Sequence, residues 1–211
     1  MSTTTVTVPG TECPADVWVP EGARAVVVVV PGATWTRHGP ETQALIAALH
    51  GEGLATVVAD VHPHAEAERR FAVTLLTDRL AAAVTWVREE MTVGPVGLLV
   101  EGIGAGAALS VAAQSPTVSA VVSVNGRPEL ARHPVEQVRS PVLMLVDGVD
   151  PAVAELNRTA AAAMAGRAGV RVVSGATGQE VAGEAAEWLA RTMSDGLRQR
   201  GGPEGTHDSG G

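Results

Sequence analysis

Residues 96–109 read VGLLVEGIGAGAAL and decide the fold class. The apolar run Val96–Val100 predicts a buried β-strand, because a strand covered on both faces needs no alternation of polar residues. A glycine-rich turn, Gly102–Gly106, follows at once, and the alanine-rich segment Ala105–Gln114 has the composition of a helix. We therefore expect a strand, a tight turn and a helix in direct succession.

The same unit of strand then helix repeats along the chain. Valine-rich runs that predict buried parallel strands lie at 25–30, 55–59, 96–100, 119–124, 142–146 and 170–173. Segments with helical spacing of apolar residues lie at 40–50, 71–90, 105–114, 151–165 and 180–193. Two alternating runs, 4–8 and 16–19, predict an antiparallel hairpin at the sheet edge. The expected fold class is α/β, a three-layer sandwich with a mostly parallel sheet and helices on both faces.

Length and composition indicate one domain. The chain has 211 residues, a usual size for a single hydrophobic core. We expect the α/β domain to span residues 1–196. Residues 197–211 are expected to form a disordered tail, because they offer little apolar surface to offset the entropy of ordering. The start of the chain resembles no signal peptide and no run is long enough to span a bilayer, so a cytoplasmic protein without membrane contact is expected.

Composition also excludes several kinds of chemistry. The formal net charge of −8 argues against a nucleic-acid partner. The chain contains no lysine, which excludes Schiff-base chemistry and a P-loop lysine. Its one cysteine, Cys13, permits neither an intrachain disulfide nor a multi-cysteine metal site. We expect no cofactor.

Ligands of such sheets bind beyond the carboxyl ends of the strands, so the loops there carry the candidate site. Among them, the loop 60–68 places Asp60, His62, His64, Glu66 and Glu68 at alternate positions. Imidazole and carboxylate groups in this pattern are a conceivable zinc or manganese site. Short polar runs rarely chelate a metal alone, so a solvated acidic loop and no metal are expected.

Several loops together resemble the small dienelactone-hydrolase-like branch of the α/β-hydrolase superfamily. Residues 31–40, PGATWTRHGP, are similar to that family's loop HGSGSSRHSP, and residues 125–128, NGRP, to its GGRP turn. Residues 147–150, DGVD, with 155–157, ELN, are similar to its acid loop, and residues 174–178, SGATG, to its histidine loop PGATH. The resemblance covers most of residues 15–193. In this family the stretch 96–109 is the nucleophile elbow, a strained turn that lifts a serine or cysteine above the sheet.

The resemblance implies a catalytic triad of which only the acid, Asp150, is retained. The ungapped alignment puts Gly102 at the nucleophile position, and a shifted register puts Gly104 there. Gly178 stands where the family has its histidine base. An acid alone orients and stabilises a base but does no chemistry. We therefore predict a pseudoenzyme that does not hydrolyse esters and that binds a small molecule or a partner protein, a second copy of the chain included.

The resemblance also implies binding residues in the first loop. Backbone amides of Ala33 and Ile103 would be the oxyanion donors, and such donors survive side-chain changes. Thr34, Trp35 and His38 are candidate residues of the pocket rim. Trp35 is expected to line the pocket, and His38 to hold the loop by hydrogen bonds.

Glu101 supports an alternative function. It directly precedes the vacated nucleophile position, and a carboxylate at a buried strand end could act as an acid or base. An active hydrolase or lyase of altered mechanism could use it, or a displaced histidine such as His38 or His62. Pairing with an arginine at the rim is the commoner role for such a carboxylate.

Two other motifs have structural interpretations as well. Asp150 followed by Pro151 is the pattern of an ordinary helix N-cap, and that role can coexist with a catalytic one. Gly102, Gly104 and Ala107 satisfy the dinucleotide fingerprint G-x-G-x-x-A. That fingerprint normally opens the first strand–helix unit, and the stretch 96–109 comes later, so cofactor binding is not expected.

Overall fold

A mostly parallel sheet forms the middle layer of the computed structural model, which describes residues 3–32, 35–62, 72–174 and 178–200. The described strands lie in the order β1-β2-β4-β3-β5-β6-β7-β8. Their bounds are β1 Thr4–Thr7, β2 Pro14–Trp18, β3 Val26–Val30, β4 Ala55–Ala59, β5 Val96–Glu101, β6 Val118–Val124, β7 Val142–Val146 and β8 Ala168–Val172. β2 pairs antiparallel with both β1 and β4, and the remaining pairs are parallel. The predicted α/β class and the antiparallel edge hairpin are confirmed.

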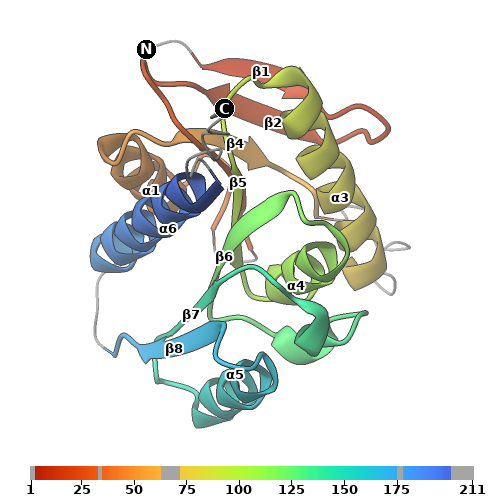
Figure 1. Cartoon of the computed structure of the whole chain (residues 1–211), viewed down its shortest axis with the longest axis vertical. Helices are drawn as coiled ribbons and strands as arrows, with labels where there is room; N and C mark the ends of the chain where they lie inside the picture. The colour runs from red at the N-terminus through yellow and green to blue at the C-terminus, as the bar shows by residue number, and fades with distance from the viewer. Residues whose placement is uncertain (1–2, 33–34, 63–71, 175–177, 201–211) are drawn as a thin grey trace, which may run out of the picture.

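Five α-helices of the described residues cover the sheet (Figure 1). α1 and α6 lie side by side over one face, and α3, α4 and α5 pack on the other face. The bounds are α1 Pro40–Gly51, α3 Ala72–Glu90, α4 Gly104–Gln114, α5 Pro151–Ala163 and α6 Gly178–Arg200. Two 3₁₀ turns, Pro128–Leu130 and Val135–Gln137, were not predicted. No helix of the described chain is long and apolar enough to cross a bilayer.

The valine run of β3 shows why the sheet has two covered faces. All five residues, Val26–Val30, are fully buried. Val26, Val28 and Val30 pack in the core beneath α3 and α4, and Val27 and Val29 pack in the core beneath α1 and α6. A strand whose alternate residues enter two separate cores must be apolar throughout, which is the pattern that predicted it.

Two expectations need correction at the end of the chain. The run 170–173 was predicted as a buried strand, but β8 pairs with β7 alone and is largely exposed, as an edge strand is. α6 begins at Gly178 and continues to Arg200, past the predicted domain end at residue 196. Residues 201–211 lie outside the described residues, so disorder in this tail stays a prediction.

The strand order defines where a ligand crevice is expected. β3 has β4 on one side and β5 on the other. The connection that leaves β3 and the connection that leaves β4 therefore run in opposite directions across the sheet. In open α/β sheets ligands bind at such a switch point, outside the carboxyl ends of the strands. The loop after β3 and the turn after β5 therefore frame the candidate site.

Candidate functional site

The turn after β5 has the backbone geometry of a strained strand-to-helix connection. Gly102 has φ +58°, in the left-handed region that L side chains rarely adopt. Its N–H donates to the Val124 carbonyl at 3.0 Å, and its own carbonyl accepts from Arg127 N at 2.9 Å. These bonds fix the turn against the end of β6, two residues before α4 begins at Gly104. The predicted succession of strand, tight turn and helix is confirmed.

The two glycines of this turn have opposite surroundings. A Cβ built on Gly102 would meet no atom within 4 Å. A Cβ built on Gly104 would lie 3.1 Å from Val100 Cβ, and Gly104 is buried within α4. A side chain would therefore enter open space at Gly102 and a filled core at Gly104.

The side chain of Glu101 connects the end of β5 to the loop after β3. Its side chain is only 7% exposed, and its Oε2 accepts from Gly32 N at 3.0 Å and from Trp35 N at 3.3 Å. A buried carboxylate needs such donors, because hydrogen bonds to the ionised form offset the cost of removing it from water. The expected partner was an arginine, whereas the partners described here are backbone amides of the loop after β3.

Gly32 has to be glycine for this bridge to form. A Cβ at Gly32 would overlap the Glu101 carboxylate. The absence of a side chain lets the loop backbone approach the acid closely. The turn after β5 and the loop after β3 are thus joined through one side chain.

The loops after β6 and β7 are joined in a similar way. Asn125 N–H donates to the Leu145 carbonyl at 2.8 Å, and Asp147 N–H donates to Asn125 Oδ1 at 2.9 Å. The Asn125 side-chain amide donates to Asp147 Oδ2 at 3.3 Å. Asn125 has φ +47°, which asparagine tolerates better than most residues. Buried Asn157 of α5 donates to the Gly126 carbonyl at 2.9 Å and so connects the same turn to α5.

Asp150 lies exposed at the start of α5 and caps it. Its Oδ1 accepts from Ala152 N at 2.9 Å, and Pro151 occupies the first helical position. The N-cap interpretation of Asp150 is confirmed in the structure. Gly178 is the exposed first residue of α6, and the only described atom within 4 Å of a Cβ built there is Glu41 Cγ of α1, at 3.9 Å.

The predicted rim residues of the first loop have different positions. Ala33 and Thr34 lie outside the described residues. Trp35 packs partly against the core beneath α1 and α6. His38 Nε2 lies 2.9 Å from Asp16 Oδ2, a hydrogen bond that holds the loop against β2 as the sequence predicted. Ile103, next to Gly102, packs partly against the core of the other face.

The alternating loop 60–68 is only partly described. Asp60 and His62 are in the structure, and His64, Glu66 and Glu68 lie outside the described residues. Within residues 3–32, 35–62, 72–174 and 178–200, no group of three or more histidine, cysteine, aspartate or glutamate side chains could hold a metal ion.

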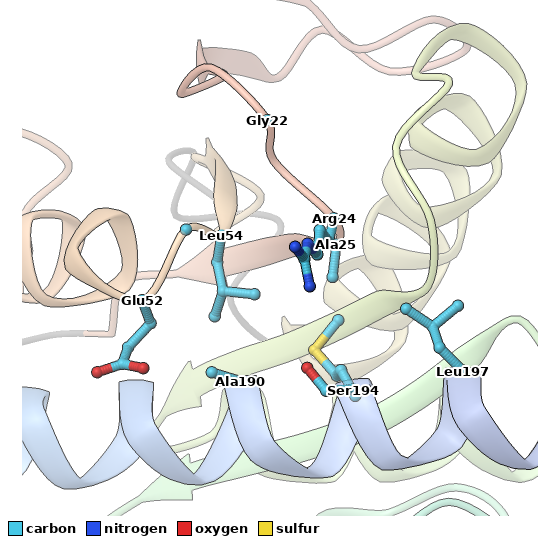
Figure 2. A pocket seen from close by; sticks show the side chains of 10 residues that line it. Gly22, Arg24, Ala25, Glu52, Leu54, Ala190, Ser194 and Leu197 are labelled. Atoms are coloured by element: carbon cyan, nitrogen blue, oxygen red, sulfur yellow. The ribbon is translucent and has the colours of Figure 1, made fainter.

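One cavity lies at the opposite edge of the sheet from these loops. Its volume is about 170 Å³, and Figure 2 shows Arg24 and Glu52 among the side chains around it, with α6 as one wall. Ala25 and Leu54 directly precede β3 and β4, so the cavity lies at the amino ends of the strands. It is remote from the switch-point loops, and none of the residues predicted for the site lines it.

Sequence reasoning missed one polar cluster, on β2. Asp16 is 9% exposed. Its Oδ1 accepts from Thr5 Oγ1 at 2.8 Å, and its Oδ2 lies 3.6 Å from Arg37 Nε. An acid within the otherwise apolar strand β2, and an Arg-His pair in the loop after β3, were the available signals.

Several solved structures, named for hydrolases or esterases, are similar to this chain. A dienelactone hydrolase from Anabaena variabilis matches with a TM-score of 0.78 and 30% identity, over 90% of this chain and 96% of that chain. A cold-adapted esterase from an Arctic intertidal metagenomic library matches with a TM-score of 0.70 and 19% identity, over 90% and 93%. A serine hydrolase homologue from Coxiella burnetii matches with a TM-score of 0.68 and 19% identity, over 91% and 97%. The last two show a likeness of fold alone.

Two curated relatives, from two strains of Mycobacterium tuberculosis, are provisionally named phosphoribosyl transferases. Each is 39% identical over 166 residues, which are 75% of this chain and 37% of the relative. The chain therefore spans much less than half the length of these relatives. No family model matches the chain.

We predict that Glu101→Ala destabilises the protein by about 1–3 kcal/mol, because two loop amides lose a buried acceptor. Hydrogen exchange at Gly32 N and Trp35 N should become faster, and Glu101→Gln, which keeps an acceptor oxygen, should change both quantities less. Denaturant unfolding and amide exchange measure them. The matched control is Glu155→Ala on the surface of α5, expected within about 0.5 kcal/mol. Unchanged exchange at both loop amides would contradict the bridge.

We also predict opposite thiol reactivities at the two glycines of the turn, in a Cys13→Ala background that removes the native thiol. Gly102→Cys should cost about 1–2 kcal/mol for its left-handed backbone, yet react quickly with iodoacetamide because its side chain enters open space. Gly104→Cys should react slowly, since its side chain must pack against Val100. Intact mass over time measures both rates in the folded protein. Equal rates, or the reverse order, would show that the turn differs from the one described.

Proposed function

Because the chain belongs to the dienelactone-hydrolase-like branch of the α/β-hydrolase superfamily, we propose that it is a non-hydrolytic member of that branch. It keeps the fold and the elbow turn but offers no nucleophile, and it binds a small molecule or a partner protein. The observation that carries this proposal is Gly102, a residue with a left-handed backbone, open space at its Cβ position and no side chain.

The backbone at Gly102 supports its assignment as the vacated nucleophile position. A nucleophile elbow needs a sharp turn from strand to helix that lifts one side chain clear of the sheet. Gly102 meets both requirements, whereas a side chain at Gly104 would be directed into Val100. The ungapped alignment is therefore favoured over the shifted register.

The chemistry of acyl transfer supports the loss of hydrolysis. The nucleophile attacks the carbonyl carbon, the base takes and returns its proton, and the acid orients the base. In the proposed alignment glycines occupy the first two positions, Gly102 and Gly178. Asp150 retains the third, but it serves in the structure as a helix cap. Removal of triad members leaves about 10³–10⁴-fold catalysis over water in a serine protease, from the oxyanion hole and binding alone.

The environment of Glu101 gives little support to the alternative of an acid or base in an altered mechanism. Its Oε2 already accepts from two loop amides, and its side chain is buried beside the loop. Its geometry fits a positioning residue that holds the loop after β3 near the elbow turn. The open space beside Gly102 is the part of this region that a small ligand could enter.

The activity in the names of the Mycobacterium tuberculosis relatives is not the activity that we propose for this chain. Most of their length lies outside the match, and the matched part corresponds to a chain with a hydrolase fold. We assign any phosphoribosyl transfer by those proteins to their unmatched part.

Incubation of the folded protein with p-nitrophenyl acetate and with a fluorophosphonate probe tests the proposal. We expect no turnover above that of the unfolded chain and no covalent adduct by intact mass, because neither glycine offers an attacking atom. A catalytically active esterase of the same fold, run in parallel, shows that the reagents work. Stoichiometric labelling of the folded chain, lost on unfolding, would overturn the proposal.

A further inference from the structure

A second cavity lies between strands β1, β2 and β4 and helix α1. Its volume is about 240 Å³, and its walls come from β1, β2, β4, α1 and the loop after β3. Polar residues that line it include Asp16, Trp18, Arg37, His38, Gln43 and Thr56. A water molecule occupies about 30 Å³ of liquid, so this space has room for a small organic molecule.

The strand register gathers these polar residues on one face. Thr5 and Val58 flank Asp16 on the neighbouring strands, and Thr56 is the cross-strand partner of Trp18. Ile46 of α1 and Val58 of β4 add an apolar surface to the same cavity. The cavity is therefore amphipathic, with a polar cluster next to aliphatic walls.

Two hydrogen-bond donors on residues that line this cavity are buried and lack a partner in the described chain. They are Trp18 Nε1 and Arg37 Nη1. An indole N–H and a guanidinium N–H can only donate. A buried donor without an acceptor costs about 1–3 kcal/mol. Neither atom has water-accessible surface, so an acceptor oxygen in the cavity reaches them only when the neighbouring side chains shift.

The acceptors already present do not serve these donors. Asp16 accepts from Thr5 through Oδ1, and its Oδ2 faces His38 Nε2 and Arg37 Nε. His50 Nε2 lies 3.1 Å from Thr56 Oγ1, and its ring stacks edge-on against Trp18, with centroids 4.5 Å apart. Burial lowers the pKa of His50 and so favours its neutral form, and His50 itself does not line the cavity.

We propose that this cavity binds a small carboxylate with a short apolar tail. One carboxylate oxygen accepts from the outer nitrogen of Arg37 and the other from the indole nitrogen of Trp18, and the tail lies against Ile46 and Val58. Guanidinium groups suit this role because their fork of donors matches a carboxylate. Arg37 also offsets the charge of Asp16 in the same cluster. The proposal does not depend on the missing nucleophile, because none of its residues belongs to the elbow turn.

Titration with sodium propionate, followed by the indole N–H signal of Trp18 in ¹⁵N-labelled protein, tests the site. Loss of one signal in Trp18→Phe assigns it among the four tryptophans. We expect a saturable shift with propionate, and no comparable shift with propionamide or with sodium chloride at equal ionic strength. Arg37→Gln should weaken the affinity about tenfold, the loss expected when one charge-assisted hydrogen bond is removed.

A second variant keeps the test decisive if Arg37→Gln unfolds. Gln43 is exposed in the first turn of α1, where an acid is compatible with the helix. Gln43→Glu should weaken propionate binding by placing a negative charge in the cavity wall. Gln137→Glu, exposed and outside the cavity, is the matched control and should leave the affinity unchanged. A non-saturable shift, an equal shift with propionamide, or full affinity in both Arg37→Gln and Gln43→Glu would overturn the proposal.

Discussion

The left-handed backbone at Gly102 is the constraint on which the candidate site depends. β5 lies between β3 and β6, and the chain has to leave this buried position and enter α4 within two residues. Such a turn requires a residue with positive φ, and the hydrogen bonds of Gly102 to Val124, the last residue of β6, and to Arg127 in the following loop hold it in place. For most side chains this conformation costs about 1–2 kcal/mol. A family that places a nucleophile there accepts that strain for reactivity, whereas glycine here adopts the same turn at little cost.

The Glu101 carboxylate links this turn to the rest of the switch point. Its hydrogen bonds to Gly32 and Trp35 tie the loop after β3 to the end of β5. On the other side of the turn, Gly102 contacts the loop after β6, and Asn125 connects that loop to Asp147 after β7. Four consecutive loops of the carboxyl edge are thus joined by specific bonds. The arrangement fits a scaffold that keeps its shape without the nucleophile.

Patterns within single elements predicted the fold well, because burial on two faces dictates residue type directly. The valines of β3 and the alternating runs of the hairpin are examples. β8 was predicted as buried, since a short valine run does not show whether a second neighbouring strand exists. The partners of Glu101 could not be predicted either, because they depend on how closely the Gly32 backbone approaches a residue 69 positions away. The same holds for Asp16 and His38, which the fold brings together from β2 and a distant loop.

The central claim is that the scaffold of a hydrolase is present and only its reacting groups are absent. Reconstruction measures this most directly: ester hydrolysis by Gly102→Ser, Gly178→His and the double variant, compared with the unaltered chain. The account predicts that hydrolysis rises in the double variant well above both single variants and above the unaltered chain. A folded double variant no faster than the unaltered chain, or an unaltered chain that already turns over substrate, would contradict it.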